Sequence, residues 1–374
     1  MNIVFRVDAS VAIGSGHVFR CLTLARALRE KGAKASFICR AHEGHLRDLL
    51  RENDFDVTLL PPNVFADKCR HDVEYETWLG ASWQSDAEET RAAIEAFETT
   101  PDWLVVDHYG VDRRWERAVR RSVGRIMATD DLANRAHECD ILLDQNLVAQ
   151  MQARYDDKVP PSCVKLLGPA YALLQPIYAS LHDRSLPRAG PIRRIFIFFG
   201  GFDVSNLTGR AIAAFLRMAR PDIEVDVVIG SDSPHAQSVL SQVAKHGNIH
   251  LHSGLPTLAE LMAKSDLAIG AGGATTWERL CLKLYSLVVT LAPNQIPVAS
   301  ELEQRGLIRW IGNANDVSES CIAKAMSPLI CSGIRSDWLI GYENLVDGHG
   351  GQRVSETILN NGSSLSARVL ENHE

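Results

Sequence analysis

The sequence lacks the short cysteine and glycine motifs that identify several common classes of protein. Its eight cysteines are scattered and form no CxxC pair, so neither a zinc site nor a redox dithiol is indicated, and we interpret them as reduced thiols. The GxxxxGKS/T loop of P-loop enzymes and the GxGxxG turn of dinucleotide-binding enzymes are also absent. We therefore expect no metal and no cofactor.

An excess of charge of one sign and long hydrophobic runs are missing too. The formal net charge is −7 and charged residues make up 23% of the chain, so no basic surface suited to a phosphate backbone is indicated. Residues 2–8 indicate a short strand carrying Arg6 and Asp8, which suits neither a signal peptide nor a membrane span. We expect a cytoplasmic protein that binds a small molecule, with no nucleic acid partner and no membrane span. The oligomeric state stays open, with a monomer slightly favoured.

Apolar runs of strand length alternate with amphipathic stretches of helix length along the chain, which is typical of repeated βα units in a parallel sheet. In the first half we expect strands at 2–7, 34–40, 55–60, 103–107, 124–129 and 141–143, with helices near 16–31, 43–52, 85–98 and 112–122. In the second half we expect a strand that runs into Gly200 and Gly201, and others at 225–229, 248–252, 266–270, 286–291 and 308–311.

The two halves resemble each other, since each opens with a strand, a glycine-rich turn and a helix. With 374 residues the chain exceeds the roughly 250 to 300 residues over which one core grows. We predict an α/β protein of two Rossmann-like domains facing a central cleft, with ligands at the carboxyl ends of the strands. Pro160-Pro161 and the polar stretch 182–194 indicate the connection. The expected N-terminal domain is 1–170, the C-terminal domain 171–345, and a C-terminal helix and tail 346–374.

The first candidate site is the turn that carries Gly14, Gly16 and His17, between a strand and a helix. Glycines there let a ligand approach the backbone, and the N–H groups of the first helical turn favour an anionic or electron-rich group. The helix dipole disfavours the imidazolium, which favours a neutral His17 that can act as a base. The alternative is a capping or surface histidine. Asp8 ends the same strand and is either the residue that orients His17 or a turn carboxylate.

Polar residues also follow three neighbouring strands of the first half. Asp107, His108 and Tyr109 end the strand at 103–107, and further acids and amides follow the next two strands. Strand ends of this kind are binding positions in parallel sheets. Asp107 and His108 together with Asp130 and Asp131 suggest a metal site as an alternative, but no close-spaced ligand set occurs, and each Asp can cap the following helix.

Two segments of the second half are candidate ligand-binding positions. Gly200, Gly201 and Asn206 lie between a strand and a helix, where backbone amides and polar side chains suit a diphosphate. Asn294 and Gln295 end an apolar strand, and their amides can bind sugar hydroxyl and acetamido groups as donor and acceptor. A plain turn is the alternative for Asn294.

A second glycine-rich turn carries Gly272, Gly273 and Thr275 and opens another helix. Glu278 lies about one turn into that helix, where it can accept hydrogen bonds from a ribose diol. The alternative is an acid that simply favours the first turn of its helix. Two such turns in one domain favour binding of phosphate groups.

These motifs together resemble the nucleotide-sugar hydrolases of pseudaminic acid biosynthesis, over residues 3 to 358. The resemblance rests on segments 14–18 and 20–22, 78–80, 102–109, 144–146, 168–169 with 171–174, Gly200-Gly201 with Asp203, 270–278 and 294–295. Each segment alone is unspecific, whereas the set is specific.

The resemblance implies hydrolysis of UDP-2,4-diacetamido-2,4,6-trideoxy-β-L-altropyranose at the anomeric carbon with inversion, without a metal. It implies that His17 is catalytic. The family also resembles MurG-like glycosyltransferases of the two-Rossmann (GT-B) type, which implies UDP between the Gly200 loop and the Gly272 turn, with Glu278 toward the ribose. Gln175 and Ile177 depart from the family's charged pair, and Pro293 from an expected acid. A glycosyltransferase and a non-catalytic nucleotide-sugar binding protein remain the alternatives.

Overall fold

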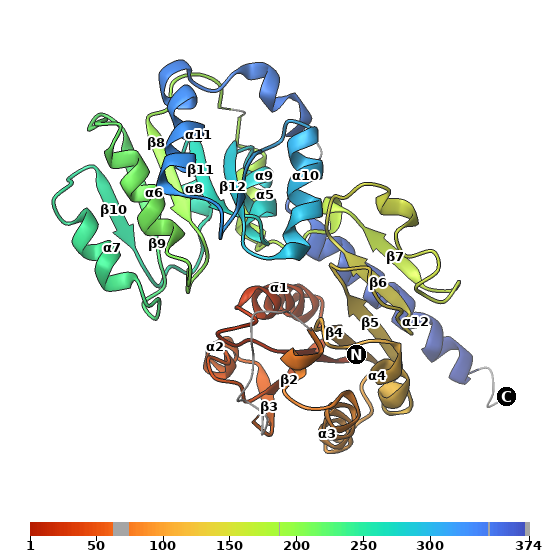
Figure 1. Cartoon of the computed structure of the whole chain (residues 1–374). Helices are drawn as coiled ribbons and strands as arrows, with labels where there is room; N and C mark the ends of the chain where they lie inside the picture. Colours follow the sequence, from red (N-terminus) through yellow and green to blue (C-terminus); the bar gives the residue numbers. More distant parts are fainter. Residues whose placement is uncertain (63–74, 187, 343–344, 371–374) are drawn as a thin grey trace. The chain divides into compact units, whose positions relative to one another are not determined.

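The chain forms two compact units, and the computed structural model describes residues 1–62, 75–186, 188–342 and 345–370 (Figure 1). The first unit comprises Met1–Asn146, Gln150–Leu173 and His349–Glu374, and the second comprises Leu147–Ala149 and Leu174–Gly348. Residues 371–374 of the expected tail, and Cys69, lie outside the described residues.

The first unit is built on a parallel seven-stranded sheet in the order β3-β2-β1-β4-β5-β6-β7. Its strands are β1 (Asn2–Val7), β2 (Lys34–Arg40), β3 (Asp56–Leu60), β4 (Trp103–Asp107), β5 (Arg125–Thr129), β6 (Ile141–Asp144) and β7 (Val164–Leu167). Its main helices are α1 (Gly16–Glu30), α2 (Arg47–Glu52), α3 (Trp83–Glu95), α4 (Arg113–Val119) and α12 (Gly350–Leu370). The first six strands have the Rossmann order. The order in which strands are added to the sheet reverses between β1 and β4.

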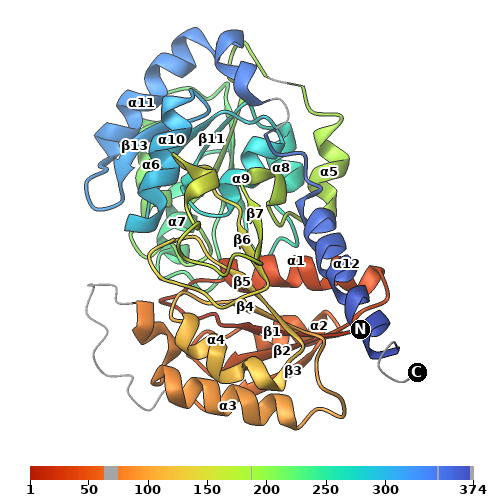
Figure 2. The same cartoon turned by 90° about the vertical axis from the view of Figure 1, so that its right-hand side faces the viewer.

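Alternate strand residues of this sheet feed two hydrophobic cores, as the two-residue period of a strand requires. On one face Phe5 and Val105 pack in a cluster with residues of α1, α2 and α12. On the other face Val4 and Val106 pack with residues of α3 and α4. Figure 2 shows α1 and α12 on one side of the sheet and α3 and α4 on the other.

Helix α1 is defined at its end by a glycine. Gly32 has φ +86°, a conformation that costs glycine little, and its N–H donates to the Arg29 carbonyl (2.9 Å). The next N–H, of Ala33, donates to the Leu28 carbonyl (3.1 Å), which completes a Schellman motif. Leu28 and Ala33 are both buried in the core on that face, so the helix ends where the chain must turn into β2.

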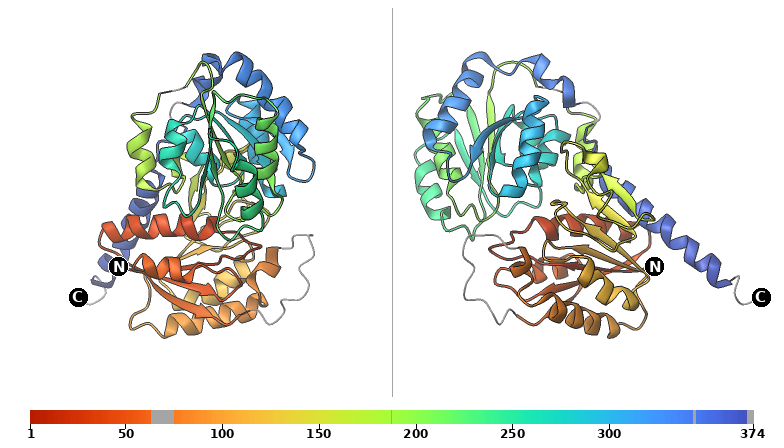
Figure 3. Two further views of the ribbon diagram at one scale, coloured as in Figure 1. Left: turned by 90° about the vertical axis from the view of Figure 1, so that its left-hand side faces the viewer. Right: turned by 45° about the vertical axis from the view of Figure 1, so that its right-hand side comes forward.

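The second unit repeats the plan with a parallel six-stranded sheet in the order β10-β9-β8-β11-β12-β13 (Figure 3). Its strands are β8 (Arg194–Phe198), β9 (Glu224–Val228), β10 (Ile249–His252), β11 (Leu267–Ala271), β12 (Ser286–Thr290) and β13 (Arg309–Asn313). Its helices are α5 (Pro176–His182), α6 (Leu207–Leu216), α7 (Ala236–Val243), α8 (Ala259–Lys264), α9 (Thr275–Cys281), α10 (Ile296–Gln304) and α11 (Glu319–Ser332). Helix α6 packs against α7 and α11, and α5 packs against α8 and α9.

The two Rossmann-like sheets predicted from the sequence are confirmed. The elements that were not predicted include β7, which has four residues and a charged Lys165 in its middle, and α5, which begins at Pro176. Within the described residues, none of the helices combines the length and the apolar character needed to cross a membrane.

A buried ion-pair network in the first unit connects the ends of two strands with two helices. The carboxylate of Asp86 on α3 accepts from Arg6 Nη2 (2.6 Å) on β1, from Arg40 Nη2 (2.7 Å) on β2 and from Trp115 Nε1 (2.9 Å) on α4. Burial raises the pKa of Asp86, but the Arg6 guanidinium outweighs this and holds the pKa below its ordinary value. Asp86 therefore stays charged and fixes the carboxyl ends of β1 and β2.

We expect Asp86→Ala to destabilise the first unit by about 3–5 kcal/mol, because two buried guanidinium groups lose a shared partner. Urea denaturation followed by circular dichroism measures this loss. Asp157→Ala is the control: its side chain is 82% exposed and pairs with Lys158 at the surface, so its effect should stay within about 0.5 kcal/mol. Equal effects of the two substitutions would contradict a structural role for the network.

Candidate functional site

Most of the predicted site residues lie near the strand-order reversal of each sheet. In the first unit, Val7 at the end of β1 pairs in register with Asp107 at the end of β4, so the loop after β1 begins next to Asp107. In the second unit, β8 and β11 are neighbours, and Gly200 and Gly272 follow their ends. Crevices of this kind, outside the carboxyl ends at a reversal point, are where α/β sheets bind ligands.

His17 is fixed by Asp107. The Nδ1 atom of His17 lies 2.7 Å from Asp107 Oδ1, and the His17 side chain is 10% exposed. An ionised carboxylate only accepts hydrogen bonds, so in the neutral ring Nδ1 carries the proton and donates it to Asp107. The lone pair is then on Nε2, which is the atom that can accept a proton.

Arg20 holds the same carboxylate from one turn further along α1. Its Nε donates to Asp107 Oδ2 (2.5 Å) and its Nη2 to Asp107 Oδ1 (2.6 Å), a bidentate pair. Its third nitrogen, Nη1, lies 2.8 Å from Asp131 Oδ2. Burial raises the pKa of Asp107, but Arg20 and then His17 outweigh it and hold the pKa well below its usual range. Asp107 is therefore a charged residue that orients His17.

Aromatic side chains surround the His17 ring. The Tyr109 ring lies edge-on at 4.6 Å between centroids, and Trp78 stacks on Tyr109 at 5.5 Å with 22° between the planes. Tyr75 contacts both of these rings edge-on. The hydroxyl of Tyr109 donates to Asp131 Oδ2 (2.5 Å), which fixes the ring beside His17. The imidazole therefore contacts the Arg20–Asp107 ion pair through Nδ1 and the Tyr109 ring through its edge.

The structure assigns Asp8 to a different cluster, so the hypothesis that Asp8 orients His17 is wrong. Asp8 is fully buried, with Oδ1 2.6 Å from Arg6 Nη1 and accepting the Arg40 backbone N–H (2.6 Å). His108, which the sequence predicted to bind substrate, is held by contacts within the protein. His108 is 3% exposed, its Nδ1 accepts the Gly110 N–H (3.0 Å), and its Nε2 lies 3.4 Å from Asp8. Burial lowers the pKa of His108 to about 4, so it is a neutral structural residue.

The turn before His17 has the open backbone that its glycines predicted. Gly14 has φ +80°, and an added Cβ at Gly14 or at Gly16 would meet no atom within 4 Å. The cap residue Ser15 makes no side-chain hydrogen bond to the helix. The N–H groups of Gly16, His17 and Val18 have no acceptor within the described residues. The start of α1 is therefore free to bind an electron-rich group.

A comparable free helix start exists at α9 in the second unit. The N–H groups of Gly273, Ala274 and Thr275 have no acceptor among the residues that the structure describes. The side chain of Gln295 lies over this turn: an added Cβ at Gly272 would be 3.2 Å from its Oε1, and one at Gly273 would be 3.6 Å from its Nε2. Gln295 Oε1 accepts the Leu291 N–H (2.8 Å), which leaves Nε2 as a donor beside the turn.

The other glycine turn of this unit is different, because the amides after Asn206, which the sequence predicted to bind phosphate, already have acceptors within the protein. Asp203 accepts the N–H groups of Leu207 (2.9 Å) and Thr208 (2.8 Å), and Asn206 Oδ1 accepts that of Gly209 (3.3 Å). The first donors of α6 are thus already used by the protein. A carboxylate at this helix start also opposes a second anion. Gly200 and Gly201 remain open to solvent, since an added Cβ at either would meet nothing within 4 Å.

Glu278 on α9 carries an unused acceptor. Its Oε2 is buried without a hydrogen-bond partner among the described residues. Burial raises the pKa of Glu278 to about 7, against the opposing influence of the Tyr178 hydroxyl and of Arg279. The Tyr178 hydroxyl is near enough to lower the pKa of Glu278, but Oε2 has no partner in hydrogen-bond geometry among the described residues, so a ligand hydroxyl would satisfy it. Asn294 precedes Gln295 in a short 3-10 helix, Pro293–Gln295, directly after β12.

Arg20, Arg279 and Tyr178 are among the residues of the site that were missed as functional candidates. Arg20 has a local signal, because it lies three positions after His17 and therefore on the same helix face. Arg279 has a similar one: it lies four positions after Thr275, whose hydroxyl accepts from it (3.2 Å), and its Nη2 donates to the Ala271 carbonyl (2.7 Å). Tyr178 has no local signal, because it reaches Glu278 from a helix that is distant in sequence.

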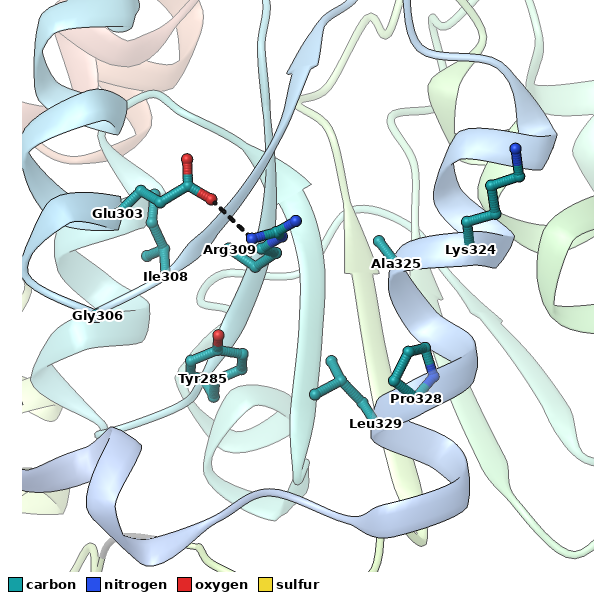
Figure 4. Close-up of a pocket in the computed structure, with 9 residues that line it drawn as sticks. All are labelled: Tyr285, Glu303, Gly306, Ile308, Arg309, Lys324, Ala325, Pro328 and Leu329. Atoms are coloured by element: carbon teal, nitrogen blue, oxygen red, sulfur yellow. Dashed lines mark ion pairs between the residues drawn. The ribbon is translucent and has the colours of Figure 1, made fainter.

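Two other features lie outside these sites. Within the described residues, no three His, Cys, Asp or Glu side chains are arranged to hold a metal ion. A pocket of about 430 Å³ lies between β13 and α11, and Figure 4 shows Glu303 and Arg309 in its wall as an ion pair (3.5 Å). None of the predicted site residues lines it.

Comparison with known proteins agrees with the resemblance seen in the sequence. No protein-family model matches the chain. Over 307 residues the chain is 26% identical to the UDP-2,4-diacetamido-2,4,6-trideoxy-β-L-altropyranose hydrolase of Campylobacter jejuni subsp. jejuni. The matched region covers 82% of this chain and 97% of that protein. It is 30% identical over 193 residues to the spore coat polysaccharide biosynthesis protein SpsG of Bacillus subtilis, covering 50% of this chain and 56% of SpsG. The predicted resemblance to such hydrolases is confirmed.

The fold is shared with solved structures of the GT-B type. The crystal structure of Acinetobacter baumannii MurG matches with a TM-score of 0.63 at 12% identity, over 96% of this chain and 99% of MurG. At this identity the match concerns the fold, and it confirms the predicted likeness to MurG.

We expect Glu278→Gln to stabilise the protein at pH 8 but not at pH 5. The pKa of this carboxyl is about 7 in the folded chain and 4.5 without burial, so its contribution to stability is present below about pH 4.5 and is lost as the pH rises through 7. Thermal or urea unfolding at the two pH values should show a gain of about 1–3 kcal/mol at pH 8. Glu260→Gln, an exposed acid in the first turn of α8, is the control. A gain that does not depend on pH would refute the buried ionisation.

Proposed function

We propose that the protein hydrolyses a UDP-linked 2,4-diacetamido-2,4,6-trideoxy sugar at the anomeric carbon, with inversion, and releases UDP and the free sugar. The observation that carries this proposal is the His17–Asp107 pair at the open start of α1, which makes His17 Nε2 a proton acceptor. Support comes from the similarity to the Campylobacter hydrolase, which extends over 97% of that enzyme.

The proposed role of His17 is that of a general base. Hydrolysis needs a water molecule that attacks the anomeric carbon on the face opposite to the departing UDP. His17 Nε2 orients this water and takes its proton, an effect that typically contributes about 10²–10⁴ in rate. Asp107 stabilises the imidazolium that forms, as the carboxylate of a catalytic triad does. The proton acceptor is therefore prepared without a metal ion.

The proposed binding site for UDP is the start of α9. Gly273, Ala274 and Thr275 offer N–H donors at the positive end of a helix, which suits a diphosphate and stabilises the charge that it gains as the sugar leaves. The Nε2 of Gln295 lies beside the same turn. Glu278 Oε2, buried and without a partner among the described residues, accepts a ribose hydroxyl. Gly200 and Gly201 give the nucleotide space at the neighbouring loop.

A glycosyltransferase is the second candidate, favoured by the fold shared with MurG. The two candidates differ in whether water or another molecule accepts the sugar. The purified chain is incubated with the UDP-linked diacetamido sugar and no acceptor, and free UDP and the anomer of the released sugar are followed by NMR. Release of UDP with an inverted anomer supports the hydrolase. Release only after addition of an acceptor supports a transferase, and binding without release supports a non-catalytic protein.

His17→Ala should lower kcat by about 10²–10⁴ and leave the Kd for UDP nearly unchanged, because the base is lost and the nucleotide contacts are not. Turnover assays and calorimetric titration with UDP measure the two effects. His250→Ala is the control, since His250 lies on the edge strand β10 and pairs with Glu224 at a half-exposed position. Parallel loss of turnover and of UDP binding in His17→Ala would assign His17 a binding or folding role.

Glu278→Ala should weaken UDP binding by about 1.5–3 kcal/mol, the value of a hydrogen bond to a charged group. Calorimetric titrations with UDP and with pyrophosphate, which has no ribose, separate loss of the ribose contact from general damage. The affinity for pyrophosphate should not change. Glu260→Ala removes an acid from the first turn of another helix of the same unit and should leave both affinities unchanged. An unaltered UDP affinity in Glu278→Ala would contradict the ribose assignment.

A further inference from the structure

The side chains around His17 form a closed ring of contacts with an excess of negative charge. Arg20 binds Asp107 through Nε and Nη2 and contacts Asp131 through Nη1 at 2.8 Å. Asp131 accepts the Tyr109 hydroxyl (2.5 Å), Tyr109 contacts the His17 ring, and His17 returns to Asp107. The ring contains two carboxylates and one guanidinium, all at most 10% exposed in their side chains.

We propose that Arg20 is a positioning residue that sets the pH range in which His17 works as a base. Two carboxylates without a cation would hold a proton on the imidazole, because opposite charges within a few ångströms favour the charged form of a histidine. Arg20 neutralises one of them, and its Nη2 also lies 3.2 Å from His17 Nδ1, where a positive charge disfavours the imidazolium. Asp107 thus orients His17, while Arg20 opposes the pull of the two carboxylates on a proton at the imidazole.

Other groups near His17 do not supply this balance. On α1, Cys21 lies 3.5 Å from Asp107 Oδ2, and burial raises the pKa of its thiol, so it stays neutral. After β4, burial lowers the pKa of His108 to about 4 and raises the pKa of the Tyr109 hydroxyl, so both stay neutral at pH 7. Asn146 donates to Asp131 Oδ1 (2.8 Å) and carries no charge. Arg20 is therefore the cation that acts on both carboxylates.

This inference rests on the proposed function, since it needs His17 to act as a base. The test is a series of four variants in the full chain: Arg20→Met, Asp131→Asn, the double variant with both changes, and Arg20→Lys. The acid limb of the pH–rate profile for UDP release is measured for each. The titration of the His17 ring is followed in parallel by NMR of histidine-labelled protein, with its signal assigned by its loss in His17→Asn.

The expected order of the acid limbs and NMR midpoints follows from the charge that each variant leaves around His17. Arg20→Met leaves two negative charges and should move the acid limb and the NMR midpoint upward by about one pH unit, the scale of a nearby charge. Asp131→Asn leaves no net charge and should move both downward. The double variant restores the wild-type balance, so both should return close to the wild-type values. Arg20→Lys keeps the charge but loses the bidentate hydrogen bonds to Asp107. We therefore expect kcat to fall while the pH of the acid limb does not change.

A purely structural role predicts a different result. It would lower rate or stability in every variant without an ordered shift, and that outcome overturns the inference, as does a double variant that shifts as far as Arg20→Met. The NMR midpoints separate this failure from failure of the proposed function. An ordered set of midpoints without UDP release would support the charge balance and refute the hydrolase, whereas UDP release with unordered midpoints would do the reverse.

Discussion

The first unit's site depends on one buried carboxylate, that of Asp107. Burying a charge is costly unless it is paired and hydrogen-bonded. Here both oxygens of Asp107 are used, by the two nitrogens of Arg20 and by His17 Nδ1. Rotation of the imidazole would lose its hydrogen bond to Oδ1, so the contacts that make the burial of Asp107 tolerable also favour one orientation of His17. The free Nε2 follows from that constraint.

Strand order decides that these residues meet at all. Asp107 is distant from His17 in sequence. The strand order of the sheet reverses at β1, so β4 lies beside β1, and Val7 pairs with Asp107 in register. The second unit has the same order, so the end of β8 and the turn after β11 are neighbours in the same way. A single topological rule therefore positions a candidate base in one unit and a candidate phosphate site in the other.

The sequence predicted the elements well because the alternation of strands and helices is a local property. The strands at 2–7, 34–40 and 103–107 have the expected bounds. It could not predict side-chain partners, which depend on neighbours that are remote in sequence. Asp8 and Asp107 both end a strand next to the His17 turn, and which of them orients the histidine is decided by Arg6, which holds Asp8 from its own strand, and by Arg20, which holds Asp107 from α1.

The same limit explains why two similar glycine turns of the second unit differ. Both follow a strand, and both open a helix. At α6, however, the residues just before the helix include Asp203 and Asn206, whose oxygens satisfy its first N–H groups. At α9 the corresponding residues are Gly272, Gly273 and Ala274, which have no side-chain acceptor to offer. A glycine turn thus indicates a free helix start only when the adjoining cap residues lack acceptors. By that criterion, an anion at the start of α9 would find free donors, whereas at α6 it would meet a carboxylate.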